Sequence, residues 1–250
     1  MAERVRLLLL GGTGEAAALA ARFAGDPRIE AITSLAGRTQ APAAIAGRLR
    51  TGGFGGADGL SAYLADEKID LLIDATHPYA ARMPHAAAEA CIRRGVPRLR
   101  LLRPPWASID GDRWIGASDM TDVTAKLPGL ARRVFLTTGQ RDLDVLAPLI
   151  DIWFLIRLIE PPVTPLPLAL CEIRLARGPF RTKNEISLFR DHRIEALVSK
   201  NSGGEATYGK IEAARALGLP VVMVERPAAP TGETVGTIDA CLAWLETRIS

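Results

Sequence analysis

The sequence has few cysteines and no long apolar run. Its three cysteines, Cys91, Cys171 and Cys241, are widely separated and show no metal-ligand spacing, so we expect buried thiols and neither disulfides nor a metal site. No uncharged apolar run approaches the roughly 18 residues of a membrane-spanning helix. The charged residues after Met1 lead directly into a strand-like run, which leaves no signal-peptide pattern. These absences predict a cytoplasmic protein that does not associate with a membrane.

Lysine is also scarce, with five lysines among 31 basic residues. Basic and acidic residues are distributed evenly, leave a net charge of +3, and form no basic tail or stripe. Nucleic acid is therefore not an expected partner. The abundance of arginine suits carboxylated ligands, although composition alone does not establish one. The oligomeric state stays open, and the sequence is compatible with a monomer.

What the chain does contain is an alternation of short apolar runs and helix-like segments. The strands expected are 5–10, 29–35, 49–54 (weak), 71–74, 98–102, 134–137, 152–156, 196–198 and 220–224. The helices expected are 15–24, 60–67, 80–94, 120–126, 142–149, 183–192, 205–217 and 238–247. This order predicts an α/β protein with two Rossmann-like, doubly wound parallel-sheet domains facing a central cleft.

A proline pair suggests where the two domains meet. Arg103-Pro104-Pro105-Trp106 breaks the alternation, because neither a helix nor a strand continues through Pro-Pro. We therefore expect a nucleotide-binding domain over residues 1–104 and a second α/β domain over residues 105–250 that completes the substrate cleft.

The most informative motif is a glycine turn after the first strand. Gly11, Gly12, Thr13, Gly14 and Glu15 follow four leucines and open an alanine-rich helix, and Gly12, Gly14 and Ala17 fit the G-x-G-x-x-A dinucleotide fingerprint. Such a turn lets backbone N–H groups approach a pyrophosphate at a helix N-terminus. A glycine-rich turn also occurs in α/β domains that bind no nucleotide, but the strand-turn-helix position favours nucleotide binding.

The end of the second strand indicates which nucleotide is bound. NAD-binding domains usually place a carboxylate there for the ribose 2′-hydroxyl, but this sequence has none from Ala31 to Gly56. It offers Ser34, Arg38 and Thr39, whose guanidinium and hydroxyl groups suit the 2′-phosphate of NADP. The alternative is that Arg38 is an ordinary solvated arginine. We expect NADP in preference to NAD.

Three further polar loops follow predicted strands, where ligands bind in parallel sheets. The first carries Thr76, His77, Pro78 and Tyr79 after the strand that ends at Asp74, although a helix cap and a structural histidine would also explain it. The others carry Thr138, Gly139 and Gln140, for which capping is an alternative, and Lys200, Asn201, Ser202 and Gly203, which suit an anion.

Two familiar motifs fail on inspection. The segment from Gly204 to Lys210 matches G-x-x-x-x-G-K, but Ile211 stands where a P-loop has Ser or Thr, and we expect Gly209 and Lys210 within a helix. No Tyr-x-x-x-Lys pair is present, so hydride chemistry here would proceed without that acid–base couple. Neither a Gly-x-Ser-x-Gly nor a His-Glu-x-x-His motif occurs.

Taken together, four blocks resemble the precorrin-6A reductase family of cobalamin biosynthesis. The blocks are Gly11-Gly12-Thr13-Gly14-Glu15, Asp74-Ala75-Thr76-His77-Pro78-Tyr79-Ala80, Ser199-Lys200-Asn201-Ser202-Gly203-Gly204 and Val222-Met223-Val224-Glu225-Arg226-Pro227. The resemblance implies two α/β domains with the macrocycle between them. It also implies NADPH-dependent reduction of one double bond of precorrin-6A to give precorrin-6B.

Together with the resemblance, the patterns described above lead to a hypothesis for the role of each residue. Cofactor-binding residues would be Gly11, Gly12, Thr13, Gly14, Glu15, Ser34, Arg38, Thr39 and Thr76. Substrate-binding residues would be Pro78, Thr138, Gly139, Gln140, Lys200, Asn201, Ser202 and Gly203. His77 and Tyr79 are the catalytic candidates, for proton delivery or substrate orientation, with water as the alternative donor. Competing functions are an NADP-dependent reductase or epimerase of another small substrate and a non-enzymatic NADP-binding regulator.

Overall fold

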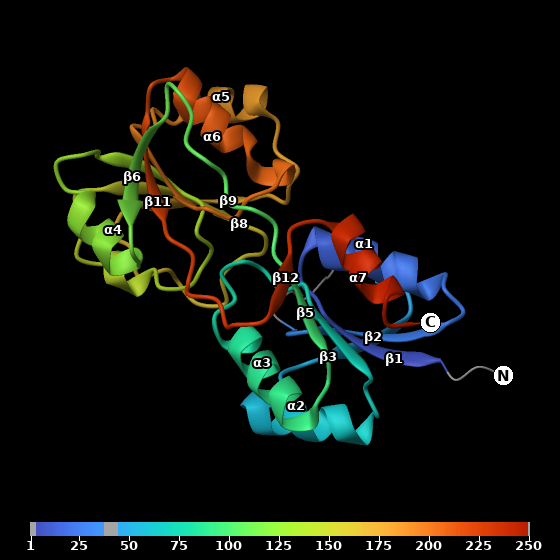
Figure 1. Ribbon diagram of the computed structural model, residues 1–250. Coiled ribbons are helices and arrows are strands. Elements are labelled where there is room, and N and C mark those ends of the chain that lie inside the picture. The colour runs from blue at the N-terminus through green and yellow to red at the C-terminus, as the bar shows by residue number, and fades with distance from the viewer. Residues whose placement is uncertain (1–3, 38–44, 250) are drawn as a thin grey trace. The chain divides into compact units, whose positions relative to one another are not determined.

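The computed structural model describes residues 4–37 and 45–249 and divides into two compact units (Figure 1). The first unit contains the chain up to Pro104 together with the residues from Pro227 onward, and the second unit is Pro105–Arg226. This differs from the expected division, which assigned residues 227–250 to the second domain. The chain passes from unit to unit at Pro104-Pro105 and at Arg226-Pro227, so both crossings are marked by proline.

The first unit is built on a six-stranded, all-parallel sheet in the order β12-β5-β4-β1-β2-β3. Its strands are β1 (Val5–Leu10), β2 (Ile29–Leu35), β3 (Arg48–Thr51), β4 (Leu71–Asp74), β5 (Arg98–Leu101) and β12 (Glu233–Val235). The last of these explains the altered division, because β12 pairs with β5 and thereby returns the final segment to the first sheet.

Helices cover both faces of this sheet, as a doubly wound fold requires. They are α1 (Gly14–Ala24), α2 (Gly56–Asp66), α3 (Arg82–Arg94) and α7 (Ile238–Glu246). On one face, Leu7 and Leu9 pack with α1 and α7; on the other, Leu8 and Leu10 pack with α2 and α3. Since successive side chains of a strand point to opposite faces, the run of four leucines in β1 serves both layers.

The second unit repeats the architecture with a six-stranded parallel sheet in the order β6-β11-β10-β7-β8-β9. Its strands are β6 (Arg113–Ala117), β7 (Arg133–Leu136), β8 (Trp153–Leu158), β9 (Cys171–Leu175), β10 (Ala196–Lys200) and β11 (Pro220–Val224). Its helices are α4 (Met120–Lys126), α5 (Thr182–Asp191) and α6 (Gly209–Ala216), with 3₁₀ turns η1 (Asp144–Leu146) and η2 (Glu205–Thr207). Phe135 and Leu155 pack with α5 and α6 on one face, and α4 lies on the other (Figure 1).

The prediction of two doubly wound parallel α/β sheets is confirmed, but several expected elements change. Residues 142–149 do not form an α-helix; only η1 is present, since Asp142 has a φ of 59° and Pro148 has no N–H to donate. The expected helix 205–217 is divided at Tyr208 into η2 and α6. The strands β6, β9 and β12 were not expected, and all three lie at sheet edges.

Strand order reverses once in each sheet, between β1 and β4 in the first and between β7 and β10 in the second. In open parallel sheets, ligands bind beyond the carboxyl ends of the strands at such a reversal. The four polar loops singled out in the sequence follow these four strands. The fold therefore gives each unit one pair of candidate binding loops.

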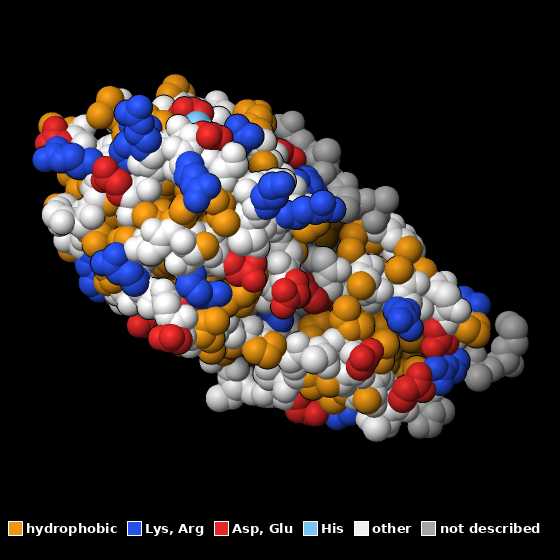
Figure 2. Space-filling model, turned by 90° about the horizontal axis from the view of Figure 1, so that it is seen from above, with side chains coloured by type: hydrophobic (Ala, Val, Ile, Leu, Met, Phe, Trp, Pro, Cys, Tyr) orange, Lys and Arg blue, Asp and Glu red, His pale blue; other side chains and the backbone are white. Residues whose placement is uncertain are grey.

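The described ranges contain no helix long and apolar enough to cross a membrane. They also contain no group of three or more His, Cys, Asp or Glu side chains able to hold a metal ion. On the face seen in Figure 2, Lys and Arg side chains are interspersed with Asp and Glu, so charge of neither sign forms a continuous stripe there.

Candidate functional site

The glycine turn follows β1 at the strand reversal of the first unit. The Gly11 N–H donates to the Ser34 carbonyl at 2.9 Å, and a Cβ on Gly11 would lie 3.1 Å from Leu35 Cδ2, so this glycine is packed against β2. Gly12, with a φ of +114°, and Gly14 are exposed, and a Cβ on either would meet no atom within 4 Å. The turn is therefore tight on its inner side and open on its outer side, where a ligand could approach the backbone.

Thr13 ties this turn to the neighbouring loop. Its Oγ1 accepts a hydrogen bond of 3.1 Å from the Ala16 N–H and so caps α1. The same hydroxyl donates to the Ala75 carbonyl at 2.9 Å, beyond the end of β4. One side chain therefore fixes both the helix N-terminus and the second loop, a link that the sequence did not reveal.

The loop after β4 is held by a carboxylate that was not among the predicted site residues. Asp74 is fully buried, and its Oδ1 accepts from the Thr76 N–H at 3.0 Å and from Thr76 Oγ1 at 2.6 Å. Its Oδ2 has no hydrogen-bond partner within residues 4–37 and 45–249 and lies 3.7 Å from Nε of the buried Arg100. A charged residue that ends an otherwise apolar strand is the signal that could have identified Asp74.

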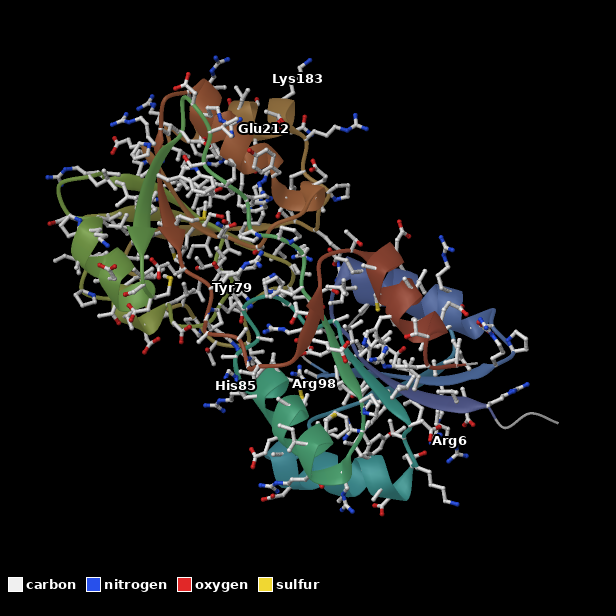
Figure 3. The ribbon with its side chains drawn as sticks, in the orientation of Figure 1. Arg6, Tyr79, His85, Arg98, Lys183 and Glu212 are labelled. Carbon is white, nitrogen blue, oxygen red and sulfur yellow. The ribbon has the colours of Figure 1, made fainter. Side chains whose placement is uncertain are left out.

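His77 and Tyr79 both belong to this loop, which leads into α3. Tyr79 is labelled in Figure 3. The Tyr79 N–H donates to His77 Nδ1 at 3.2 Å, and the ring centroids are 5.9 Å apart. With Nδ1 as acceptor, the neutral imidazole carries its proton on Nε2. His77 is exposed, Tyr79 is half-buried and Pro78 between them is buried, so the loop presents both rings on a fixed backbone.

Glu15 forms an ion pair with Arg103, which the sequence did not link to it. Arg103 Nη1 donates to both carboxylate oxygens of Glu15, at 2.9 and 2.8 Å. Burial alone would raise the pKa of Glu15, but a backbone hydrogen bond and Arg103 outweigh it and hold that pKa below its usual value. The negative charge of Glu15 near the N-terminus of α1 is therefore balanced by the positive charge of Arg103.

A small pocket within the first unit brings several predicted residues together. It is lined by Thr13, Glu15, Thr76, Pro78, Leu101 and Arg103. Four of these six were predicted as site residues from the sequence. The pocket lies where the loops after β1, β4 and β5 meet, so the first strand reversal gathers one part of the predicted site.

The predicted cofactor residues after β2 are only partly described. Ser34 is 5% exposed, and its Oγ accepts from Arg50 Nη1 on β3 at 3.2 Å. Arg38 and Thr39 lie outside the described residues. Arg50 was not predicted, although an arginine placed two residues before a Gly-Gly pair was visible in the sequence.

In the second unit, the loop after β7 meets the end of β10. Lys200 Nζ donates to the Thr138 carbonyl at 2.7 Å, and burial lowers the pKa of Lys200. Thr138 is 4% exposed, and its Oγ1 has no hydrogen-bond partner in the described ranges. Gly139 has a positive φ of 84°, and Gln140 Nε2 donates to the Glu160 carbonyl at 3.3 Å. Lys200 and Thr138, predicted from separate loops, are thus neighbours.

Asn201 supports the fold of its own unit. Its Oδ1 accepts from the Trp106 N–H at 2.7 Å, and its Nδ2 donates to the Trp106 carbonyl at 3.0 Å. The Ser202 N–H donates to the Lys200 carbonyl, and Gly203 has a positive φ of 71°. Arg226 donates to the carbonyls of Asn201 and Ser202. The side-chain amide of Asn201 therefore anchors the segment that enters the second unit.

Comparison with known proteins matches the chain to one family along nearly its full length. Residues 6–246 match the family described as "Precorrin-6x reductase CbiJ/CobK". Proteins named "Precorrin-6A reductase" from Rhodococcus erythropolis and Sinorhizobium sp are 49% and 46% identical to it. These alignments cover 97% and 96% of this chain and 98% and 92% of the relatives.

A solved structure agrees with the sequence comparison. The protein titled "CobK precorrin-6A reductase" superposes with a TM-score of 0.92 at 42% identity, and the match covers 97% of this chain and 96% of the other. Fold, strand order and sequence thus lead to the same family. The chain belongs to the precorrin-6x reductase CbiJ/CobK family.

Proposed function

We propose that this protein catalyses the NADPH-dependent reduction of one double bond of precorrin-6A to give precorrin-6B, a step of cobalamin biosynthesis. The observation that carries the proposal is an open glycine turn at a strand reversal in a chain whose relatives are named precorrin-6A reductases. A reductase needs a source of electrons, and the first unit has the strand order and turn of a dinucleotide-binding fold.

The residues present fit such a cofactor. The exposed backbone at Gly12 and Gly14 can accept a pyrophosphate without collision with a side chain, and α1 directs its N-terminus toward it. Gly11 sets the turn against β2, and Thr13 fixes it to the β4 loop. Thr76, held by Asp74, would contact the nicotinamide half. The 2′-phosphate would lie near Ser34, Arg38 and Thr39.

Glu15 would contribute to orientation at this site. An unpaired carboxylate beside a pyrophosphate would repel it, but Arg103 neutralises Glu15 in the pocket. The ion pair thereby lines the pocket beside Thr76 with polar groups and adds little repulsion toward the pyrophosphate. Pro78, buried against the same pocket, would bound the substrate side.

The second unit would hold the carboxylates of the macrocycle. Lys200 supplies a positive charge next to Thr138, whose hydroxyl has no hydrogen-bond partner among the described residues. Gly139, Gln140, Ser202 and Gly203 would add donors from the two loops, and Asn201 would keep the second loop in place. A positive charge surrounded by hydrogen-bond donors fits a substrate rich in anionic side groups.

The reaction adds one hydride and one proton across a double bond. When bound, reduced nicotinamide supplies the hydride to one ring atom, and the neighbouring atom must then gain a proton. The His77 Nε2–H and the Tyr79 hydroxyl are the candidate donors, since both belong to the loop that follows β4. Water is the alternative donor, in which case the two rings would orient the substrate.

The proposal is tested with the purified chain, precorrin-6A and NADPH. We expect a change in the visible spectrum of the macrocycle that requires NADPH and matches the NADPH oxidised. In single turnover, His77→Ala and Tyr79→Phe should each slow NADPH oxidation by roughly 10²- to 10⁴-fold if the altered residue delivers the proton. Rates in both variants that are unchanged from the wild type would show that the two side chains are only scaffolding. Absence of any NADPH-dependent change in the wild type would overturn the function.

A further inference from the structure

The end of β3 carries an arginine, Arg50, that is held firmly yet has no acidic partner in the part of the chain that the structure describes. Arg50 Nη1 donates to Ser34 Oγ at 3.2 Å and to the Gly52 carbonyl at 2.6 Å, and Nη2 donates to the Gly53 carbonyl at 2.8 Å. Its guanidinium also lies over the Phe54 ring, 3.8 Å from the centroid. It lies 5.1 Å from the centroid of the Tyr63 ring as well, so five contacts fix the orientation of this half-buried cation.

These contacts leave both charge and hydrogen-bonding capacity unused. A guanidinium has five N–H donors, and three are engaged with Ser34, Gly52 and Gly53, so the Nε–H and one Nη2–H have no acceptor among the described residues. No carboxylate of the described residues forms an ion pair with Arg50. All three acceptors are neutral oxygens, so the positive charge is not compensated within that part of the chain.

A second arginine on the same strand shows the contrast. Arg48, two residues earlier, forms a bidentate pair with Glu67, with Nη–Oε distances of 3.0 and 3.1 Å, and also lies 4.0 Å from Glu30. Its charge is neutralised at the surface. Two arginines on one strand thus have opposite roles: Arg48 has acidic partners, and Arg50 is positioned without one.

The place of Arg50 in the sheet indicates its ligand. Arg50 is in register with Ser34 on β2, and the Gly52 N–H donates to the Leu35 carbonyl at 2.8 Å, so the ends of β2 and β3 form one edge. In this fold the pyrophosphate lies at the β1 turn, and the adenosine ribose lies beyond the end of β2. The macrocycle would lie on the other side of β1, toward β4 and β5.

We propose that Arg50 binds the 2′-phosphate of NADPH and makes this enzyme select NADPH over NADH. The guanidinium offers two donors to phosphate oxygens, and Ser34 Oγ, which accepts from Arg50, keeps its own proton to donate. This inference rests on the proposed function, because it assigns a specificity-determining residue to the cofactor site of that reaction.

The test measures dissociation constants of the full chain for NADPH and NADH, with 2′,5′-ADP and 5′-AMP as probes that lack nicotinamide. Arg50→Gln should raise the dissociation constants for NADPH and 2′,5′-ADP by roughly 10- to 100-fold. It should leave the dissociation constants for NADH and 5′-AMP within about twofold of the wild-type values. Arg50→Lys keeps a charge but loses the paired donors, so its loss should be smaller, roughly 3- to 10-fold. Arg48→Gln is the matched control and should change none of the four constants.

The outcomes separate this inference from the function on which it rests. If the wild type binds neither dinucleotide, the proposed function fails and the inference with it. If the wild type prefers NADPH and Arg50→Gln keeps that preference, only the inference fails. Equal weakening of phosphorylated and unphosphorylated ligands would also overturn it, because Arg50 would then merely support the loop. Should Arg50→Gln not fold, an unchanged NADPH preference in Arg50→Lys would count against the proposal.

Discussion

At the scale of single residues, Lys210 has the most unusual environment. It lies at the start of α6 and is 5% exposed; its Nζ donates to the Thr207 carbonyl at 2.9 Å and lies 4.9 Å from the centroid of the Trp106 ring. Burial, reinforced by Arg157, lowers the pKa of Lys210 to about 7, although Glu185 opposes the shift. A buried amine with one carbonyl partner is costly to charge.

This lysine should make stability depend on pH. The folded-state pKa of about 7 lies below the 10.5 of an unperturbed lysine, so the unfolded chain binds more protons between these two values. Stability should therefore rise with pH through this window. Below it, Lys210 is charged in both states, so its destabilising effect should be constant and should add no pH dependence. Relative to Lys210→Met, the wild type should gain up to roughly 1.4 kcal/mol per pH unit from pH 7 to pH 10.

Urea unfolding at a series of pH values measures the effect. Lys183→Met is the control, because Lys183 is exposed on α5 and its removal should leave the pH profile of stability unchanged. A wild-type profile parallel to that of Lys210→Met over the whole range would show that Lys210 keeps an ordinary pKa in the folded protein.

Sequence reasoning at this scale located loops where a residue type has a distinctive backbone role. The glycines at positions 11, 12 and 14, and Thr76 and Pro78 near them, follow β1 and β4 as the strand-turn-helix patterns predicted, and their binding roles stay predictions. Arg103 and Asp74 were missed, since a long-range ion pair and a buried carboxylate acceptor depend on which strands become neighbours. Whether Arg38 and Thr39 bind the cofactor stays a prediction.

At the scale of elements, two threonine caps in the first unit allow a controlled comparison. Thr13 caps α1 and also bonds to the Ala75 carbonyl, whereas Thr237 caps α7 through a single hydrogen bond of 3.2 Å from the Ala240 N–H. Only α1 follows the glycine turn. The two residues therefore separate the cost of losing a cap from the cost of releasing the β4 loop.

Thr13→Val should destabilise the protein by about 1 to 3 kcal/mol and weaken NADPH binding, because both the cap and the tie to Ala75 are lost. Thr237→Val should cost about 1 kcal/mol and leave NADPH affinity unchanged. Chemical denaturation and titration with NADPH measure the two effects. Unaltered NADPH affinity in Thr13→Val would mean that the link between the loops does not serve the cofactor.

The elements that sequence patterns missed share a position in the fold. β6, β9 and β12 are edge strands, and the weakly predicted β3 is the remaining edge. An edge strand has one neighbour and often an exposed face, so it needs no continuous apolar run; β9 is exposed at four of its five residues. Central strands such as β1 and β11 are buried throughout or nearly so, which explains why their bounds were predicted.

At the scale of the whole molecule, the second unit is an insertion between β5 and β12 of the first. Cys241, Trp244, Leu245 and Ile249 complete one core of the first unit from the far end of the chain. Each such side chain stabilises by roughly 1.5 to 3 kcal/mol when buried, and a domain of this kind is stable by only about 5 to 15 kcal/mol. The first unit therefore depends on residues 227–249.

Fragments test this dependence. We expect residues 105–226 alone to unfold cooperatively, and residues 1–104 alone to lack a cooperative transition. Joining 1–104 to 227–250 through a short Gly/Ser linker should restore it, since Gly236 packs close to Pro104. Circular dichroism during thermal unfolding distinguishes these cases, and cooperative unfolding of 1–104 alone would contradict the expected dependence.

The fold class was accessible from the sequence because the alternation of apolar runs and helices is a local signal. The return of the last residues to the first unit was not accessible from the sequence. The short β12 carries Glu, Thr and Val, and nothing in it specifies β5 as its neighbour. Sequence patterns accordingly predicted where loops lie along the chain, but the assignment of the last residues required the pairing of distant strands.

The insertion also bears on the order of events at the ribosome. Residues 105–226 supply all six strands of the second sheet, and they are synthesised before the residues that form β12 and α7. We therefore expect the second unit to have its full set of strands while the first unit still lacks its last strand and helix. Until β12 and α7 are available, β5 lacks its neighbour on one side, and the apolar face that α7 covers stays exposed. We therefore expect the first sheet and its apolar core to be completed only when the last residues of the chain become available for pairing.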